Sequence, residues 1–142
     1  ESTVIRKFID EEMKKELNKF INFDKKITLG TCAGIIVLSN QITNENKIIG
    51  GLNIKVNRNH YGAHSGSFIK ETSFFPLNFN KKQIYIRAPY IEKILNNVKI
   101  ISRQDDIITG VQQDNIIGLT YHPELSNDVE FYQYFNSLIK KS

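Results

Sequence analysis

Cysteine is almost absent from the sequence, and this scarcity excludes one class of protein at once. Only Cys32 occurs among the 142 residues, so no disulfide can form within the chain, and small disulfide-stapled secreted folds are excluded. Long apolar runs are also missing, since none approaches the roughly 20 residues that a membrane-spanning helix needs. The sequence shows no succession of charged, apolar and small residues typical of a signal peptide. We therefore expect a cytoplasmic chain without membrane attachment.

A strong surplus of one charge is lacking as well. The chain has 19 basic and 15 acidic residues, which gives a formal net charge of +4. The basic residues are interspersed, whereas nucleic-acid-binding proteins more often concentrate them in a stripe with stacking aromatics. We interpret these charges as solvated faces and expect no nucleic-acid partner. With 40% hydrophobic and 24% charged residues, the composition is that of one ordinary globular domain.

The order of helical and strand patterns predicts an α/β fold with a largely antiparallel extension. Apolar residues at helical spacing predict one long amphipathic helix, or two short ones, within residues 3–21. A β-branched run at 26–29 then predicts a strand that leads into a helix at 35–38. Further strands are expected at 52–56, 67–72, 84–86, 98–102, 107–111 and 116–121, with one or two helical turns around 91–95 and a final helix capped by Asn127 and Glu130.

A lone cysteine stands between small residues where the first strand is expected to turn into its helix. The five residues are Gly30, Thr31, Cys32, Ala33 and Gly34. They form the cysteine version of the nucleophile elbow, a tight turn that exposes the central side chain above a sheet. Free N–H groups and the helix dipole at a helix N-terminus favour a thiolate there. The pentapeptide alone leaves a buried structural cysteine as an equal alternative.

Of the three histidines, His122 is best placed to serve a nucleophile. It follows an apolar run, Pro123 keeps it out of a helix, and Glu124 can reach its imidazole if the turn folds back. A carboxylate on one ring nitrogen fixes the tautomer and directs the other nitrogen toward a thiol. A chance His-Pro-Glu in a loop is the alternative. His60 and His64 have no nearby Cys, Asp or Glu to complete a metal site, so we expect loop residues and no metal.

Together these segments resemble the triad (class I) glutamine amidotransferases and, within them, the glutaminase subunit of pyridoxal 5'-phosphate synthase. The match includes the elbow around Cys32 and the segment His122-Pro123-Glu124, and it follows the family's order along the whole chain. The resemblance implies an α/β, flavodoxin-like fold of three layers around a central mixed sheet. The other matching segments are Glu1-Ser2-Thr3, Gly51-Leu52, the run from Val56 through Arg58 and His60 to Gly62, Ser67-Phe68, Ile86-Arg87-Ala88-Pro89 and Thr120 to Leu125.

The resemblance also implies an activity and a role for each matching residue. Cys32 would attack the side-chain amide of L-glutamine and form a glutamyl thioester, with His122 as base and acid and Glu124 orienting the imidazole. The backbone N–H of Ala33 would donate to the oxyanion. Ammonia would pass to the synthase subunit, which builds pyridoxal 5'-phosphate, and no cofactor is implied for this chain. The family's glutamine-binding positions match Glu1, Ser2, Arg58, Ile86 and Arg87.

The sequence departs from the family pattern in two places. The family's first strands, and the glycine pair that supplies a second oxyanion donor, have no counterpart before Glu1. We therefore expect residues 1–142 to form a single domain that is incomplete at its N-terminal side. The pair Ala63-His64 also replaces an expected Arg-Gln, which changes local contacts with the partner.

Two other functions stay open on the sequence. A triad amidotransferase subunit could deliver ammonia to a different acceptor, although the segments at 58–62 and 86–89 speak against this. A non-catalytic regulatory module could keep the same fold. The intact Cys32, His122 and Glu124 speak against the second alternative.

Overall fold

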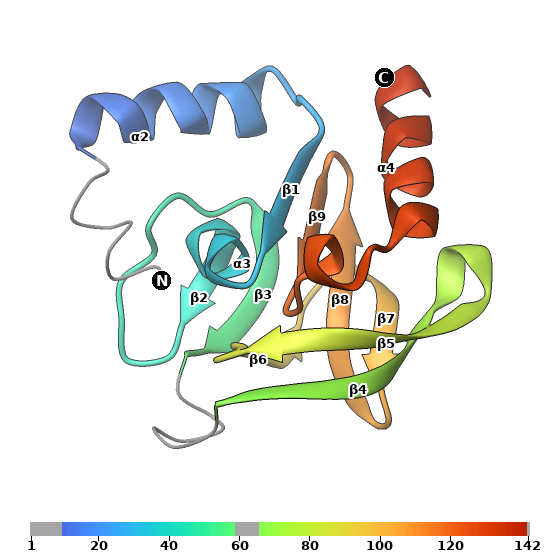
Figure 1. Cartoon of the computed structure of the whole chain (residues 1–142). Coiled ribbons are helices and arrows are strands. Elements are labelled where there is room, and N and C mark those ends of the chain that lie inside the picture. The colour runs from blue at the N-terminus through green and yellow to red at the C-terminus, as the bar shows by residue number, and fades with distance from the viewer. Residues whose placement is uncertain (1–9, 59–65, 142) are drawn as a thin grey trace.

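A mixed six-stranded sheet forms the centre of the molecule (Figure 1). The structure is a computed structural model that describes residues 10–58 and 66–141. The first strand runs parallel to its neighbour in the sheet, and every other pairing in this sheet is antiparallel. In spatial order the strands are β1 (Thr28–Thr31), β9 (Ile116–Leu119), β8 (Ile107–Gln113), β7 (Lys99–Gln104), β4 (Ser67–Phe74) and β5 (Phe79–Ile86).

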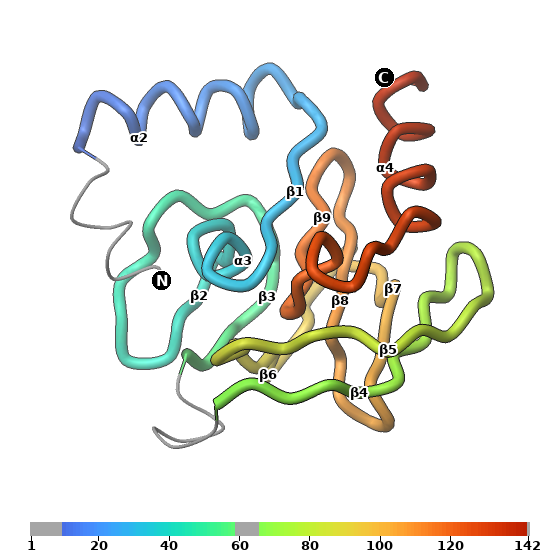
Figure 2. The backbone as a smooth tube through the Cα atoms, viewed as in Figure 1, coloured from blue at the N-terminus to red at the C-terminus, as the bar shows by residue number. Residues whose placement is uncertain are grey.

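A second, smaller sheet and a few short helices complete the described chain. In this sheet β2 (Ser39–Ile42) runs parallel to β3 (Leu52–Asn57), and β6 (Tyr90–Ile94) pairs antiparallel with the other side of β3. The tube in Figure 2 shows how β1 leads directly into the short helix that precedes β2. The helical elements are α2 (Glu11–Asn18) with the π-helical turn η1 (Lys19–Phe23), α3 (Ala33–Leu38), the 3-10 turns η2 (Phe75–Leu77) and η3 (Pro123–Ser126), and α4 (Val129–Lys141).

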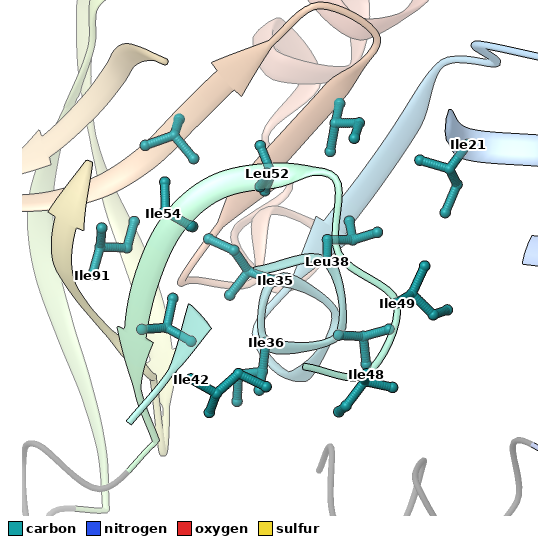
Figure 3. Packing of buried hydrophobic residues seen from close by; sticks show 14 residues of the cluster. Ile21, Ile35, Ile36, Leu38, Ile42, Ile48, Ile49, Leu52, Ile54 and Ile91 are labelled. Carbon is teal, nitrogen blue, oxygen red and sulfur yellow. The ribbon is translucent and has the colours of Figure 1, made fainter. Parts of the chain in front are cut away.

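One apolar core surrounds α3, and its members come from several parts of the chain (Figure 3). The helix contributes four consecutive buried residues from Ile35 to Leu38. Leu52 and Ile54 of β3 and Ile91 of β6 face it from the small sheet. A helix whose apolar residues surround its whole circumference is one that is buried on all sides. The last four residues of α3 are therefore enclosed by the core, and Cys32 lies at the other, partly exposed end of this short helix.

A second core lies under α4 and is largely aromatic. Phe131, which is fully buried, meets Phe74 edge-on at 5.6 Å between ring centroids. The strand β9 separates the two cores by its alternation: Ile116 packs with α3, whereas Ile117 packs with the aromatic cluster. Gly118 faces α3, and a Cβ atom there would lie 2.7 Å from the Ile35 side chain. The two cores therefore cover opposite faces of the sheet, as the period of two in a strand requires.

The predicted α/β class and mixed sheet are confirmed, but the prediction of helical turns around 91–95 is wrong. Those residues form the strand β6, in which Ile94 pairs with Ile54 and Ile91 with Val56. Isoleucine has a high strand propensity, and pairing with β3 buries Ile91 to 2% exposure. The short apolar run was compatible with either structure, and the tertiary partner decided it.

The prediction of a cap on the last helix is wrong by one residue. Asn127 has a φ of 53° and ends η3 in the left-handed conformation. The carboxylate of Asp128 accepts the backbone N–H of Phe131 at 3.1 Å. This is the side-chain to N3 bond of an N-cap, so Asp128 starts α4.

The predicted amphipathic helix near the N-terminus is confirmed for the part of it that the structure describes. Asp10 caps α2 by accepting the N–H of Met13 at 2.8 Å. No side chain of α2 itself is buried, and Ile21 in the following turn η1 is the anchor to the core around α3. Within the described ranges, no helix has the length and apolarity to cross a bilayer.

Candidate active site

The turn from β1 into α3 places Cys32 in a strained backbone conformation. Its φ is 52° and its ψ is −110°, a region that residues other than glycine rarely adopt. The backbone N–H of Cys32 donates to the carbonyl of Leu119 at 2.9 Å, which extends the pairing of β1 with β9 by one residue. The predicted sharp strand-to-helix turn is therefore present, and Cys32 lies at its centre.

The cysteine side chain is partly exposed and lies against the end of another strand. Its Sγ donates to the backbone carbonyl of Ile86, the last residue of β5, at 3.4 Å. Ala33 begins α3, so its backbone N–H is one that the helix itself does not use. The thiol thus lies against the end of β5, and the next residue in the chain starts α3. The alternative of a fully buried structural cysteine does not fit this exposure.

His122 and Glu124 form a direct side-chain pair. The Nδ1 atom of His122 lies 2.8 Å from Oε2 of Glu124, where an N–H on the ring donates to the carboxylate. Of the two imidazole tautomers, this contact favours the one that carries its proton on Nδ1 and leaves Nε2 as an acceptor. His122 has an extended backbone, with φ −109° and ψ 90°, and Pro123 starts the 3-10 turn η3 behind it. The predicted fold-back of the His-Pro-Glu segment is present.

The cysteine and the histidine both follow strands that end at one edge of the sheet. Because β1 and β9 run parallel, their carboxyl ends lie side by side, with Thr31 paired to Leu119 (Figure 2). Cys32 comes directly after β1, and His122 comes shortly after β9. The backbone N–H of His122 donates to the carbonyl of Ile84 at 3.0 Å, so β5 lies against both residues. The carboxyl edge of parallel strands is where α/β folds commonly build their sites.

The residue before His122 anchors it without adding charge. Tyr121 is fully buried and meets Tyr85 at 5.5 Å between ring centroids. Burial raises the pKa of the Tyr121 phenol above its usual range, so this side chain stays neutral. Tyr121 therefore holds this segment by packing and adds no charge next to His122.

Of the five predicted glutamine-binding residues, the structure describes Arg58, Ile86 and Arg87. Arg58 makes a two-pronged ion pair with Glu45, with Nε and Nη2 at 2.8 and 2.6 Å from the two carboxylate oxygens. Its remaining nitrogen, Nη1, is buried without a hydrogen-bond partner among the described residues. Ile86 contacts the thiol through its carbonyl, and Arg87 is exposed with a φ of 44°. Glu1, Ser2, His60 and His64 lie outside the described residues.

Glu45 is a candidate functional residue that the sequence did not reveal. It lies in the loop after β2, 13 residues before Arg58, and no local pattern links the two. In the part of the chain that the structure describes, no three His, Cys, Asp or Glu side chains gather where they could hold a metal ion.

Comparison with known proteins places this geometry in a family. The family model of the SNO glutamine amidotransferases matches residues 1–141. The chain belongs to this family. A pyridoxal 5'-phosphate synthase subunit PdxT from Thermoanaerobacter sp. (strain X514) is 39% identical over 138 residues, which cover 95% of this chain and 72% of that protein. The subunit PdxT of Staphylococcus carnosus (strain TM300) is 38% identical, over 95% of this chain and 69% of its own length.

Solved structures of glutamine amidotransferases have the same fold as this SNO family member. One crystal structure of a glutamine amidotransferase has a TM-score of 0.89 at 30% identity and covers 99% of this chain and 75% of that one. A glutamine amidotransferase from Thermotoga maritima has a TM-score of 0.57 at 15% identity, over 92% and 56% of the two chains. The second likeness shows the fold alone. The expected class I amidotransferase fold is thereby confirmed.

Proposed function

We propose that this chain is the glutaminase subunit of a pyridoxal 5'-phosphate synthase, acting as a single amidotransferase domain in the cytoplasm. It hydrolyses L-glutamine and delivers ammonia to a synthase subunit. The observation that carries the proposal is the convergence of the Cys32 elbow and the His122–Glu124 pair at the carboxyl edge of β1 and β9. Membership of the SNO family and the relatives named PdxT support the reaction and the partner.

The proposed reaction uses cysteine as a nucleophile in two steps. His122 takes the thiol proton on Nε2, and the sulfur of Cys32 bonds to the side-chain amide carbon of glutamine. When the tetrahedral intermediate collapses, its C–N bond breaks, and His122 returns the proton to the departing nitrogen, which leaves as ammonia. Water then gives a proton to His122 as its oxygen bonds to the thioester carbon. When this second intermediate collapses, the C–S bond breaks, glutamate leaves, and the sulfur takes back the proton from His122. Glu124 keeps the imidazole ring oriented throughout and stabilises the imidazolium that forms when Nε2 takes the proton.

The negative charge of each tetrahedral intermediate needs a donor close to the reacting carbon. The backbone N–H of Ala33 suits this role because it follows the nucleophile at the start of α3 and has no use within the helix. Such a donor is fixed before the reaction starts, so it stabilises the oxyanion without reorganisation.

The substrate is proposed to bind along the strand ends next to the thiol. Arg58 has one buried nitrogen without a partner, and Arg87 is exposed beside Ile86, so both can donate to a carboxylate. Glu1 and Ser2 are proposed to contribute on the strength of the family match alone. Ile86 is proposed to contact glutamine near its amide, because its carbonyl already touches the Cys32 thiol.

The proposal is tested by labelling with a glutamine analogue that carries an electrophilic carbon in place of the side-chain amide. In the complex with the synthase subunit, one equivalent is expected to attach to the peptide containing Cys32, as read by mass spectrometry. An excess of L-glutamine should slow the labelling, whereas asparagine should not. Labelling elsewhere, or labelling that glutamine does not slow, would contradict the proposed site.

The ion pair between Arg58 and Glu45 gives a prediction about substrate affinity. Glu45 binds two of the three guanidinium nitrogens of Arg58, and the third has no partner among the described residues. We expect Glu45→Gln to leave the Arg58 side chain less firmly held in place. The KM for glutamine is expected to rise about tenfold, equivalent to roughly 1.4 kcal/mol, with kcat nearly unchanged. Glu11→Gln is the matched control, because it removes an ion pair on the exposed surface of α2. A fall in KM for Glu45→Gln would mean that Glu45 competes with the substrate instead.

A further inference from the structure

A glutamine is buried in β5 at a position where its side chain reaches the segment that carries His122. Gln83 is 1% exposed. Its Nε2 donates to Oδ2 of Asp128 at 2.6 Å, and its Oε1 accepts from the hydroxyl of Ser126 at 2.5 Å. A buried amide is costly unless its donor and acceptor are both used. Here both are used, and both contacts go to the same short stretch of chain.

The two partners of Gln83 lie at the far end of the 3-10 turn η3. Ser126 is its last residue, and Asp128 comes two residues later, while His122 precedes the turn at its other end. Asp128 is itself 1% exposed, and its second oxygen caps α4 by accepting the N–H of Phe131. The Gln83 amide therefore fixes the point at which η3 is joined to α4.

The strand β5 thus holds both ends of η3. At the near end, the N–H of His122 donates to the carbonyl of Ile84 at 3.0 Å. At the far end, besides Gln83, Lys81 donates to the carbonyl of Asn127 at 3.1 Å from a more exposed position. The same strand ends at Ile86, whose carbonyl touches the Cys32 thiol. The strand β5 therefore contacts both the proposed nucleophile and the proposed base.

We propose that Gln83 is a positioning residue of the reaction, which sets the placement of the His122–Glu124 pair relative to Cys32 by clamping η3 to β5. This inference rests on the proposed function, because Gln83 can affect catalysis in this way only if His122 acts on Cys32. The side-chain hydrogen bonds of Gln83 go to Asp128 and Ser126, not to His122 or Glu124. Its effect is transmitted through the 3-10 turn, which is too short to flex independently of its two anchored ends.

The test compares Gln83→Met with Thr72→Val in the assembled complex with the synthase subunit. Methionine keeps the length of the side chain but removes both hydrogen bonds. Thr72→Val removes the buried hydrogen bond between Thr72 and Tyr85, which joins β4 to β5 at 2.7 Å without touching η3. Both variants should lower Tm. Only Gln83→Met should lower kcat, by about 10- to 100-fold, the effect of a misplacement near 1 Å, with the KM for glutamine unchanged within twofold.

A second variant, Gln83→Glu, separates positioning from simple loss of stability. The introduced carboxyl faces Asp128, so the link forms only when the two carboxyls share a proton. The kcat of this variant relative to wild type should therefore rise severalfold from pH 8 to pH 6, measured where circular dichroism shows both proteins folded. The same ratio for Gln83→Met should stay flat.

The outcomes separate failure of this inference from failure of the proposed function. If Cys32→Ala abolishes glutamine hydrolysis but Gln83→Met keeps the wild-type kcat, the clamp has no catalytic role. If Thr72→Val lowers kcat as much as Gln83→Met at the same loss of Tm, the effect is general destabilisation, and the inference is likewise overturned. If Cys32→Ala keeps full activity, the proposed function itself fails.

Discussion

Cys32→Ala is expected to abolish glutamine hydrolysis while leaving the fold intact. The sulfur is the only atom of the protein proposed to bond with the substrate carbon, and removing a nucleophile of this kind lowers kcat by roughly 10⁴- to 10⁶-fold. No other cysteine exists in the chain, so no second thiol can replace it. The measurement is ammonia release by the complex with its synthase subunit, supplied with saturating L-glutamine.

The same variant should keep, or slightly gain, stability. Alanine removes only one sulfur atom from a partly exposed position, and the strained backbone of the turn stays as it is. Binding of the synthase subunit and direct use of added ammonium by the complex should both persist. Wild-type hydrolysis by Cys32→Ala would exclude the thioester route, and loss of ammonium-dependent synthesis would point to a misfolded complex.

Gly30→Ala is expected to have the largest effect on stability among substitutions in the elbow. A Cβ atom on Gly30 would lie 2.8 Å from the carbonyl carbon and oxygen of Gly34 and 2.6 Å from the Leu38 side chain. Backbone atoms cannot move aside as a flexible side chain can, so α3 would have to shift away from β1. Overpacking of this kind costs about 3 kcal/mol, a loss that chemical denaturation measures as a lower midpoint.

The second glycine of the elbow provides the control. Apart from its chain neighbours and the backbone of α3 itself, a Cβ atom on Gly34 would meet no atom within 4 Å. Gly34→Ala should therefore not lower the free energy of unfolding, and alanine's helix propensity raises it by up to about 1 kcal/mol. Equal destabilisation by both substitutions would contradict the close approach seen at Gly30.

Much of the fold could be predicted because its signals are local. The alternation of Leu52, Ile54 and Val56 in β3, and the elbow at β1 and α3, lie within a few neighbouring residues. The strand β6 was missed because its apolar run fits helix and strand equally, and only pairing with β3 decides between them. The cap at Asp128 was missed because Asn127 has the same capping chemistry one position earlier.

The candidate site shows the same division between local and distant partners. Cys32, His122 and Glu124 could be proposed from two short segments, since the histidine and its carboxylate are two residues apart. Glu45 and Gln83 could not, because their partners lie 13 and 43 to 45 positions away along the chain. Nothing in the neighbourhood of either residue distinguishes it from an ordinary surface acid or a strand glutamine. Only the folded chain brings these pairs together.

The parallel pairing of β1 with β9 also has a consequence for when activity can arise. These strands come from near opposite ends of the described chain, so their contact closes a long loop and belongs to the slower events of folding. During synthesis the ribosome releases the elbow long before the segment with His122. Until β9 docks, the segment with the proposed base is not held near the thiol, so a nascent chain carries Cys32 without the partner proposed for it.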